Sequence, residues 1–83
     1  MVMYIATFFT HFGAQSFYNN VRKQDPAARM MPVPRALSAS CGICTAFEAD
    51  LTGQIRSELP EDLEGLYQTD GRGYRTILEI EEE

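Results

Sequence analysis

Segments with strand-like composition alternate with two segments of helical spacing, and their order is what most restricts the fold of this 83-residue chain. Residues 2–9 are rich in β-branched and aromatic side chains, which predicts a buried strand. Four further segments are predicted to form strands: residues 29–33, 43–48, 63–69 and 74–80. The last two flank a strong turn signal of glycine and aspartate, so they are expected to pair as a hairpin.

Two stretches between these strands predict helices. The first has Thr10 as a suitable N-cap, carries apolar residues at helical spacing, and is expected to end near Gln24 because Pro26 follows. The second has apolar residues spaced four apart in 51–59, with Asp50 as a plausible cap. The element order is therefore strand, helix, strand, strand, helix, strand, followed by a hairpin strand.

This order favours an α+β fold in which both helices cover one face of a single sheet. We expect a ferredoxin-like two-layer sandwich (βαββαβ plus a C-terminal hairpin strand) formed by one domain, residues 1–83. Pro32 lacks an amide proton, so its strand should lie at a sheet edge or end at this residue. Four aromatic residues exceed what two short helices can cover and predict a homodimer through the sheet face or edge: Phe8, Phe9, Tyr67 and Tyr74.

Charge and composition disfavour several classes of function. The net charge is −5 and only seven residues are basic, which argues against binding to nucleic acid or an anionic membrane. No apolar run is long enough to span a bilayer, and no motif for a cofactor is present. Two cysteines do not make the disulfide framework of a secreted mini-protein. We therefore expect a cytoplasmic protein without cofactor, nucleic acid or membrane partner.

Both cysteines lie in one short segment, at Cys41 and Cys44. The thiolate form of cysteine attacks electrophiles and binds soft metals. Two prolines stiffen the backbone before Cys41, two serines can donate hydrogen bonds, an arginine would favour an anion electrostatically, and a glycine leaves backbone amides exposed. These supporting residues are Pro32, Pro34, Arg35, Ser38, Ser40 and Gly42.

Several interpretations of the two cysteines remain open at this point. Cys44 alternates with apolar residues on a predicted strand and fits a small buried hydrophobe. A Cys41–Cys44 redox pair has the right spacing, but such pairs open a helix and here a strand follows. The pair supplies only two of the four ligands of a closed zinc site, so no metal site is predicted. A carrier of sulfur or selenium needs only one exposed cysteine, and a small binding module with incidental cysteines needs none.

Three segments carry a resemblance to a known family: Tyr4-Ile5-Ala6-Thr7-Phe8 before a helix that begins at Thr10-His11, then Pro32-Val33-Pro34-Arg35, then Ser38-Ala39-Ser40-Cys41-Gly42. They resemble the DUF3343 family of small bacterial proteins, named Putative Se/S carrier protein-like. The resemblance implies a sulfur or selenium carrier rather than a self-contained enzyme, with Cys41 as carrier thiol and donor and acceptor proteins as partners. Cys44 departs from the family pattern and is either a neutral substitution or a resolving thiol.

Overall fold

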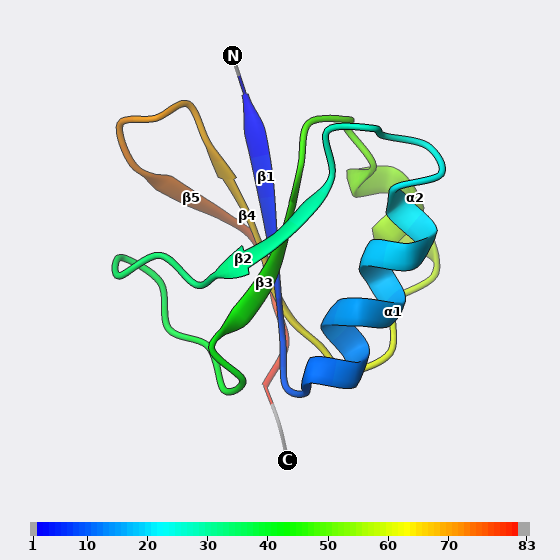
Figure 1. Ribbon diagram of the computed structural model, residues 1–83. Helices are drawn as coiled ribbons and strands as arrows, with labels where there is room; N and C mark the ends of the chain where they lie inside the picture. The colour runs from blue at the N-terminus through cyan, green and yellow to red at the C-terminus, as the bar shows by residue number, and fades with distance from the viewer. Residues whose placement is uncertain (1, 82–83) are drawn as a thin grey trace.

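The computed structural model describes residues 2–81, which form an antiparallel sheet covered on one side by helices (Figure 1). In chain order the elements are β1 (Met3–Phe8), α1 (His11–Val21), β2 (Arg29–Pro32), β3 (Ile43–Phe47), α2 (Thr52–Ser57), β4 (Leu63–Thr69) and β5 (Tyr74–Glu79). The strands lie in the order β2-β3-β1-β4-β5, and every neighbouring pair is antiparallel.

The predicted α+β architecture is confirmed, with two helices and five strands in the described residues. The strand that contains Pro32 lies at one edge of the sheet, as its missing amide proton required. The sheet continues beyond β4 into the fifth strand, β5, so it is larger than the four-stranded sheet of a plain ferredoxin-like sandwich. The ferredoxin-like description of the first six elements therefore stays an interpretation.

Helix α1 begins where the sequence predicted, at the Thr10 cap. The Thr10 hydroxyl accepts a hydrogen bond from the backbone N–H of Gly13 at 3.0 Å. The helix ends at Val21, before the predicted Gln24, and the following residues form turns. A Cβ atom added to Gly13 would lie 2.8 Å from the Cβ of Asp62, so glycine lets the first turn of α1 contact the segment before β4.

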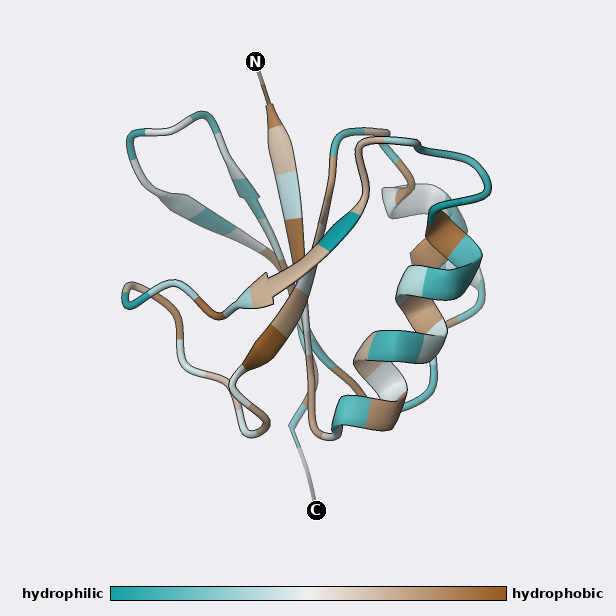
Figure 2. Ribbon diagram, viewed as in Figure 1, coloured by the Kyte–Doolittle hydropathy of each residue, from teal (hydrophilic) through white to brown (hydrophobic). Residues whose placement is uncertain are grey.

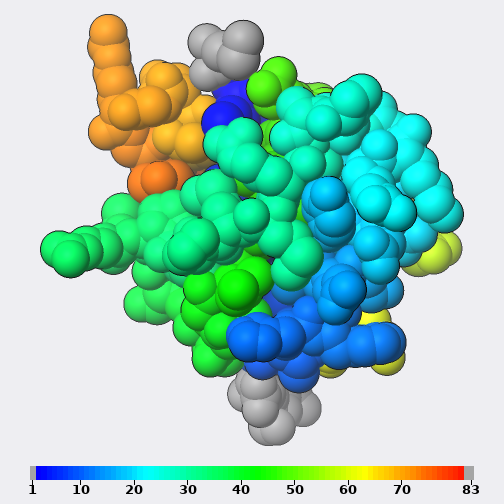
Figure 3. Space-filling view, in the orientation of Figure 1, coloured from blue at the N-terminus to red at the C-terminus, as the bar shows by residue number. Residues whose placement is uncertain are grey.

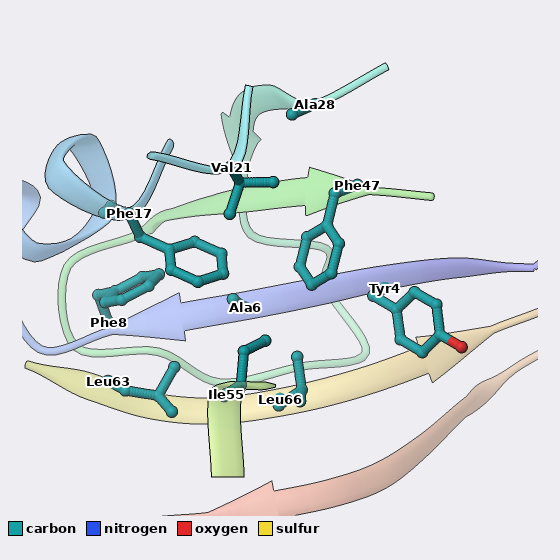
Figure 4. Packing of buried hydrophobic residues seen from close by; sticks show 11 residues of the cluster. Tyr4, Ala6, Phe8, Phe17, Val21, Ala28, Phe47, Ile55, Leu63 and Leu66 are labelled. Carbon is teal, nitrogen blue, oxygen red and sulfur yellow. The ribbon is translucent and has the colours of Figure 1, made fainter. Parts of the chain in front are cut away.

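Aromatic side chains fill the layer between the helices and the sheet, which we call the helix-side core (Figure 4). The ring of Phe17 from α1 lies 5.3 Å from that of Phe8 and 5.7 Å from that of Phe47, measured between centroids. Tyr4 stacks on Phe47 at 5.5 Å. Such offset and tilted pairs add to the stability gained from burial. The core therefore joins α1 to strands β1 and β3.

A second apolar cluster lies on the opposite, helix-free face of the sheet and contains Ile5, Cys44, Ala46 and Tyr67. Part of its cover comes from β2 and the segment after it, through Met31, Val33 and Leu37. In Figure 2 hydrophobic residues concentrate in the central strands, while the turn after α1 and the hairpin tip are hydrophilic.

This arrangement corrects the expectation of surplus aromatic surface. Phe8 belongs to the helix-side core with 0% exposure, and Tyr67 is only 8% exposed on the helix-free face. Phe9 is half-buried, and Tyr74 is 39% exposed. The homodimer thus loses most of the observations that suggested it and stays a prediction.

Helix α2 is shorter than its sequence predicted. It spans Thr52–Ser57 and buries Ile55, whereas Leu59 lies beyond its end and is 52% exposed. The chain becomes extended at Glu58, which ends the apolar stripe. The Asp50 carboxylate accepts hydrogen bonds from the Thr52 N–H at 3.2 Å and its hydroxyl at 2.7 Å, although Leu51 is the N-cap residue.

The predicted hairpin of β4 and β5 is present, with an irregularity in its register. Leu66 pairs with Leu78, but the next residue, Tyr67, pairs with Thr76, which leaves Ile77 without a direct partner. Such a bulge interrupts the strict alternation of side chains. Ile77 and Leu78 consequently both pack against the helix-side core, although strict alternation would place consecutive residues on opposite faces.

Candidate functional site at Cys41

Cys41 lies near the end of the loop that joins the antiparallel strands β2 and β3. The loop is closed by a hydrogen bond from the Val33 N–H to the Gly42 carbonyl at 3.0 Å, and it contains a tight turn in which Leu37 donates to the Pro34 carbonyl at 3.0 Å. In the space-filling view the loop, in green, projects from the body of the molecule beneath the orange tip of the β4–β5 hairpin (Figure 3). The loop therefore projects at its tip, while its apolar residues pack against the two clusters of the sheet.

Gly42 has a left-handed backbone with φ of +74°, and a Cβ atom added there would meet nothing within 4 Å. We expect Gly42→Ala to lower the free energy of unfolding by about 1–2 kcal/mol through backbone strain alone. Gly53→Ala is the matched control: the added Cβ also meets nothing, but the backbone is helical, so stability should stay equal or rise by up to about 1 kcal/mol. Urea unfolding of both variants tests this prediction. Equal losses of unfolding free energy in the two variants would contradict the explanation by backbone strain at Gly42.

The Cys41 side chain is half-buried at the margin of the helix-side core. Its Sγ donates a hydrogen bond to the Ile43 carbonyl at 3.1 Å. Cys41 lines none of three grooves on the described surface. A reaction at the Cys41 thiol would therefore take place at the surface of the molecule, where the second reactant contacts the thiol directly.

Two residues that are distant in sequence hold the backbone around Cys41. His11 Nε2 lies 2.9 Å from the Cys41 carbonyl oxygen. The Glu64 carboxylate accepts two hydrogen bonds from Ser40, from its backbone N–H at 2.8 Å and from its hydroxyl at 3.0 Å. The sequence analysis assigned neither residue to the site, so it missed both contacts. No local signal marks them, because the partners are separated by 30 and 24 residues.

The Ser40 contact also bears on the predicted support of the thiol. Both hydrogen-bond donors of Ser40 are engaged with Glu64, so in this conformation neither is directed to Cys41. Arg35 is exposed in the loop, and no hydrogen bond within residues 2–81 joins it to Cys41. Ser38 lines a groove with residues of the β4–β5 hairpin, away from the helix-side core that Cys41 touches.

Cys44 occupies a different environment from Cys41. It is 0% exposed in β3, where it pairs with Thr7 of β1 and Met31 of β2, and it packs in the cluster on the helix-free face. Burial, together with a smaller contribution from Cys41, raises the pKa of the Cys44 thiol to about 11. At neutral pH Cys44 is therefore protonated and weakly nucleophilic, which favours the interpretation that it is a small buried hydrophobe.

The described residues offer little to a metal ion. Within residues 2–81 no group of three or more His, Cys, Asp or Glu side chains is placed to hold one. Neither helix in this range has the length and apolar character needed to cross a bilayer.

Comparison with known proteins identifies one family. A search of curated proteins found no significant match. A search of solved structures likewise found none. A family model described as Putative Se/S carrier protein-like matches residues 3–67, from the start of β1 into β4, and so includes Cys41 and both of its anchors but not β5. Because this match covers most of the chain, the protein belongs to the Putative Se/S carrier protein-like family.

Proposed function

We propose that this protein carries sulfur or selenium on Cys41 between a donor protein and an acceptor protein. The observation that carries the proposal is the placement of Cys41, the partly exposed thiol of the two, on a loop that His11 and Glu64 anchor beside it. A thiol in this position suits direct contact with another protein better than enclosure of a small substrate. The family description supports the same role.

The transfer steps balance without an external oxidant or reductant. The Cys41 thiolate attacks the outer sulfur of a persulfide on the donor, a new S–S bond forms at Cys41, and the donor S–S bond breaks. The bonding electron pair leaves with the donor sulfur as a thiolate. In the second step the acceptor thiolate attacks the outer sulfur on Cys41, and Cys41 leaves as the thiolate. A donor that holds selenium in place of the outer sulfur reacts with the same balance.

Two alternatives receive less support from the geometry. A Cys41–Cys44 redox pair requires both sulfurs to approach bonding distance, but Cys41 packs toward the helix-side core and Cys44 toward the helix-free face. A binding module with incidental cysteines has no specific observation in its favour, although it fits a small domain. The carrier interpretation also implies a reducing compartment, so we place the protein in the cytoplasm.

Uptake of sulfur from glutathione persulfide tests the proposal. We expect the intact mass of the wild-type protein to rise by one sulfur atom, with the addition located on Cys41 after proteolysis. Cys41→Ser should abolish the uptake because serine supplies no thiolate, while Cys44→Ser is the matched control and should retain it.

Sulfur that appears on Cys44, or uptake that persists in Cys41→Ser, would contradict the proposed carrier role of Cys41. Mild oxidation offers a second check. Loss of two hydrogens within one chain of the wild type would support the redox pair instead.

A further inference from the structure

The loop that carries Cys41 has no regular secondary structure between Pro32 and Ile43, and such loops are mobile unless other elements hold them. Here the hydrogen bonds to distant elements concentrate at its end. They involve two consecutive residues, through the Ser40 N–H and hydroxyl and the Cys41 carbonyl, while the Gly42 carbonyl accepts from Val33 at the other end of the same loop. The backbone on both sides of the Cys41 side chain is therefore fixed, while the tip of the loop contains only its own turn.

Glu64 supplies the stronger of the two distant anchors. Both carboxylate oxygens accept from Ser40, at 2.8 and 3.0 Å, and such charge-assisted pairs are stronger than neutral hydrogen bonds. Glu64 belongs to β4, and its own carbonyl accepts from the Ile80 N–H at 2.9 Å. The Glu64 carboxylate thus connects Ser40, the residue just before Cys41, to a strand of the sheet.

His11 supplies the second anchor, from a different element. It is the first residue of α1, directly after the Thr10 cap. A carbonyl oxygen can only accept, so the 2.9 Å contact to the Cys41 carbonyl places the proton on Nε2 of the imidazole. Cys41 is consequently held between the first turn of α1 and strand β4.

We infer that Glu64 and His11 are positioning residues that fix the orientation of the Cys41 thiol for sulfur transfer. This inference rests on the proposed function of Cys41. Transfer of an outer sulfur requires the attacking, transferred and leaving atoms to lie nearly in line, so the rate depends on how the thiol is oriented. All three anchoring hydrogen bonds lie in exposed surroundings, where they contribute little to global stability.

Four measurements on five variants test the inference. The variants are Glu64→Ala, Glu64→Gln, His11→Ala, His11→Gln and the control Glu61→Ala, which removes an exposed carboxylate from the same segment. The measurements are the melting temperature, hydrogen exchange of the Ser40 amide, the rate of Cys41 alkylation by iodoacetamide, and the rate of sulfur uptake from glutathione persulfide.

We expect Glu64→Ala to slow sulfur uptake by about tenfold and to leave the melting temperature within a few degrees of wild type. Exchange of the Ser40 amide should become faster, and alkylation should become faster because the freed thiol is more accessible. His11→Ala should act in the same direction. Glutamine retains an acceptor at position 64 and a donor at position 11, so both glutamine variants should recover most of the uptake.

The failure of this inference differs from the failure of the proposed function. If the wild type takes up no sulfur, the carrier function fails. Hydrogen exchange of the Ser40 amide and alkylation of Cys41 then still show whether the anchors position the thiol. Unchanged Ser40 exchange and alkylation in Glu64→Ala then overturn the inference, whereas faster values in both support it. If the wild type takes up sulfur and Glu64→Ala does so at the same rate as Glu61→Ala, the inference is overturned while the carrier function stands.

Discussion

Replacement of Asp25 by alanine is expected to lower the free energy of unfolding by about 3 kcal/mol or more. Asp25 is only 6% exposed, and its carboxylate accepts backbone hydrogen bonds from Ala27 at 2.9 Å, Glu48 at 2.6 Å and Ala49 at 2.9 Å. It thereby connects the segment before β2 to the end of β3. Alanine leaves three N–H donors without this acceptor, and each partly buried donor that loses its partner costs about 1–3 kcal/mol. Urea unfolding monitored by circular dichroism measures the loss.

Asp70→Ala is the matched control for this substitution. Asp70 is exposed in the hairpin turn, and its carboxylate accepts from the Arg72 N–H at 3.0 Å. Water can replace this acceptor, so the loss should be about 1 kcal/mol or less. If Asp25→Ala loses no more unfolding free energy than Asp70→Ala does, the Asp25 carboxylate does not connect the segment before β2 to the end of β3.

Asp25 should also make the stability depend on pH. The backbone hydrogen bonds, that from Ala49 first, lower the pKa of the Asp25 carboxyl and outweigh the opposing effect of burial. Because the pKa is lower in the folded protein, this contribution to stability is fully present above the unfolded value of about 3.9 and is lost as the pH falls through the folded value. Between pH 5 and 2 the unfolding free energy of the wild type should therefore fall more steeply than that of Asp25→Asn. If the unfolding free energies of the two proteins fall equally with pH, Asp25 is not the source of the pH dependence.

Much of the fold could be predicted because its signals are local. The strand segments are rich in β-branched and aromatic residues, and Thr10 marks the start of α1 by its own side chain. The predicted alternation of Cys44 with apolar residues along β3 is confirmed, because Cys44 packs on the helix-free face and Phe47 in the helix-side core. Pro32 marked the edge strand because the missing amide proton of proline is a property of that residue alone.

The errors arose where partners distant in sequence decide the structure. The bulge opposite Ile77 depends on how β5 pairs with β4, and it cannot be read from the alternation of one strand. The end of α2 depends on where the chain must turn to enter β4, so Leu59 is exposed despite its spacing. Tyr67 was assigned to a free surface because its cover comes from residues such as Leu37 on the loop after β2.

The sequence allowed the residues of the candidate site to be predicted, but not the contacts that distant residues make with them. The spacing of the cysteines and glycine singled out Cys41, but nothing in its vicinity named Glu64 or His11. At Asp25 and at Glu64 a carboxylate accepts from backbone amides that are distant in sequence. Asp25 is buried and contributes to global stability, whereas the Ser40 bonds to Glu64 lie in exposed surroundings and can restrict one loop at little energetic consequence elsewhere.

Phe47→Ala is expected to lower the free energy of unfolding by about 3–5 kcal/mol. Phe47 is 0% exposed and its ring contacts those of Tyr4 and Phe17, so it joins β1, β3 and α1 in one cluster (Figure 4). Alanine removes the buried ring and leaves a cavity that these aromatic neighbours cannot fill without moving. Since small domains are stable by only about 5–15 kcal/mol, such a loss would reduce the stability of this 83-residue chain substantially.

The matched control is the same substitution at Phe12, which is 65% exposed on the first turn of α1. Phe12→Ala removes the same atoms, mostly from water, so its effect on stability should stay within about 0.5 kcal/mol. The difference between the two variants in urea unfolding isolates the contribution of burial. A Phe47→Ala variant that unfolds at the same urea concentration as Phe12→Ala would mean that the helix-side core does not hold α1 against the sheet, and the position of His11 beside Cys41 would then lose its structural support.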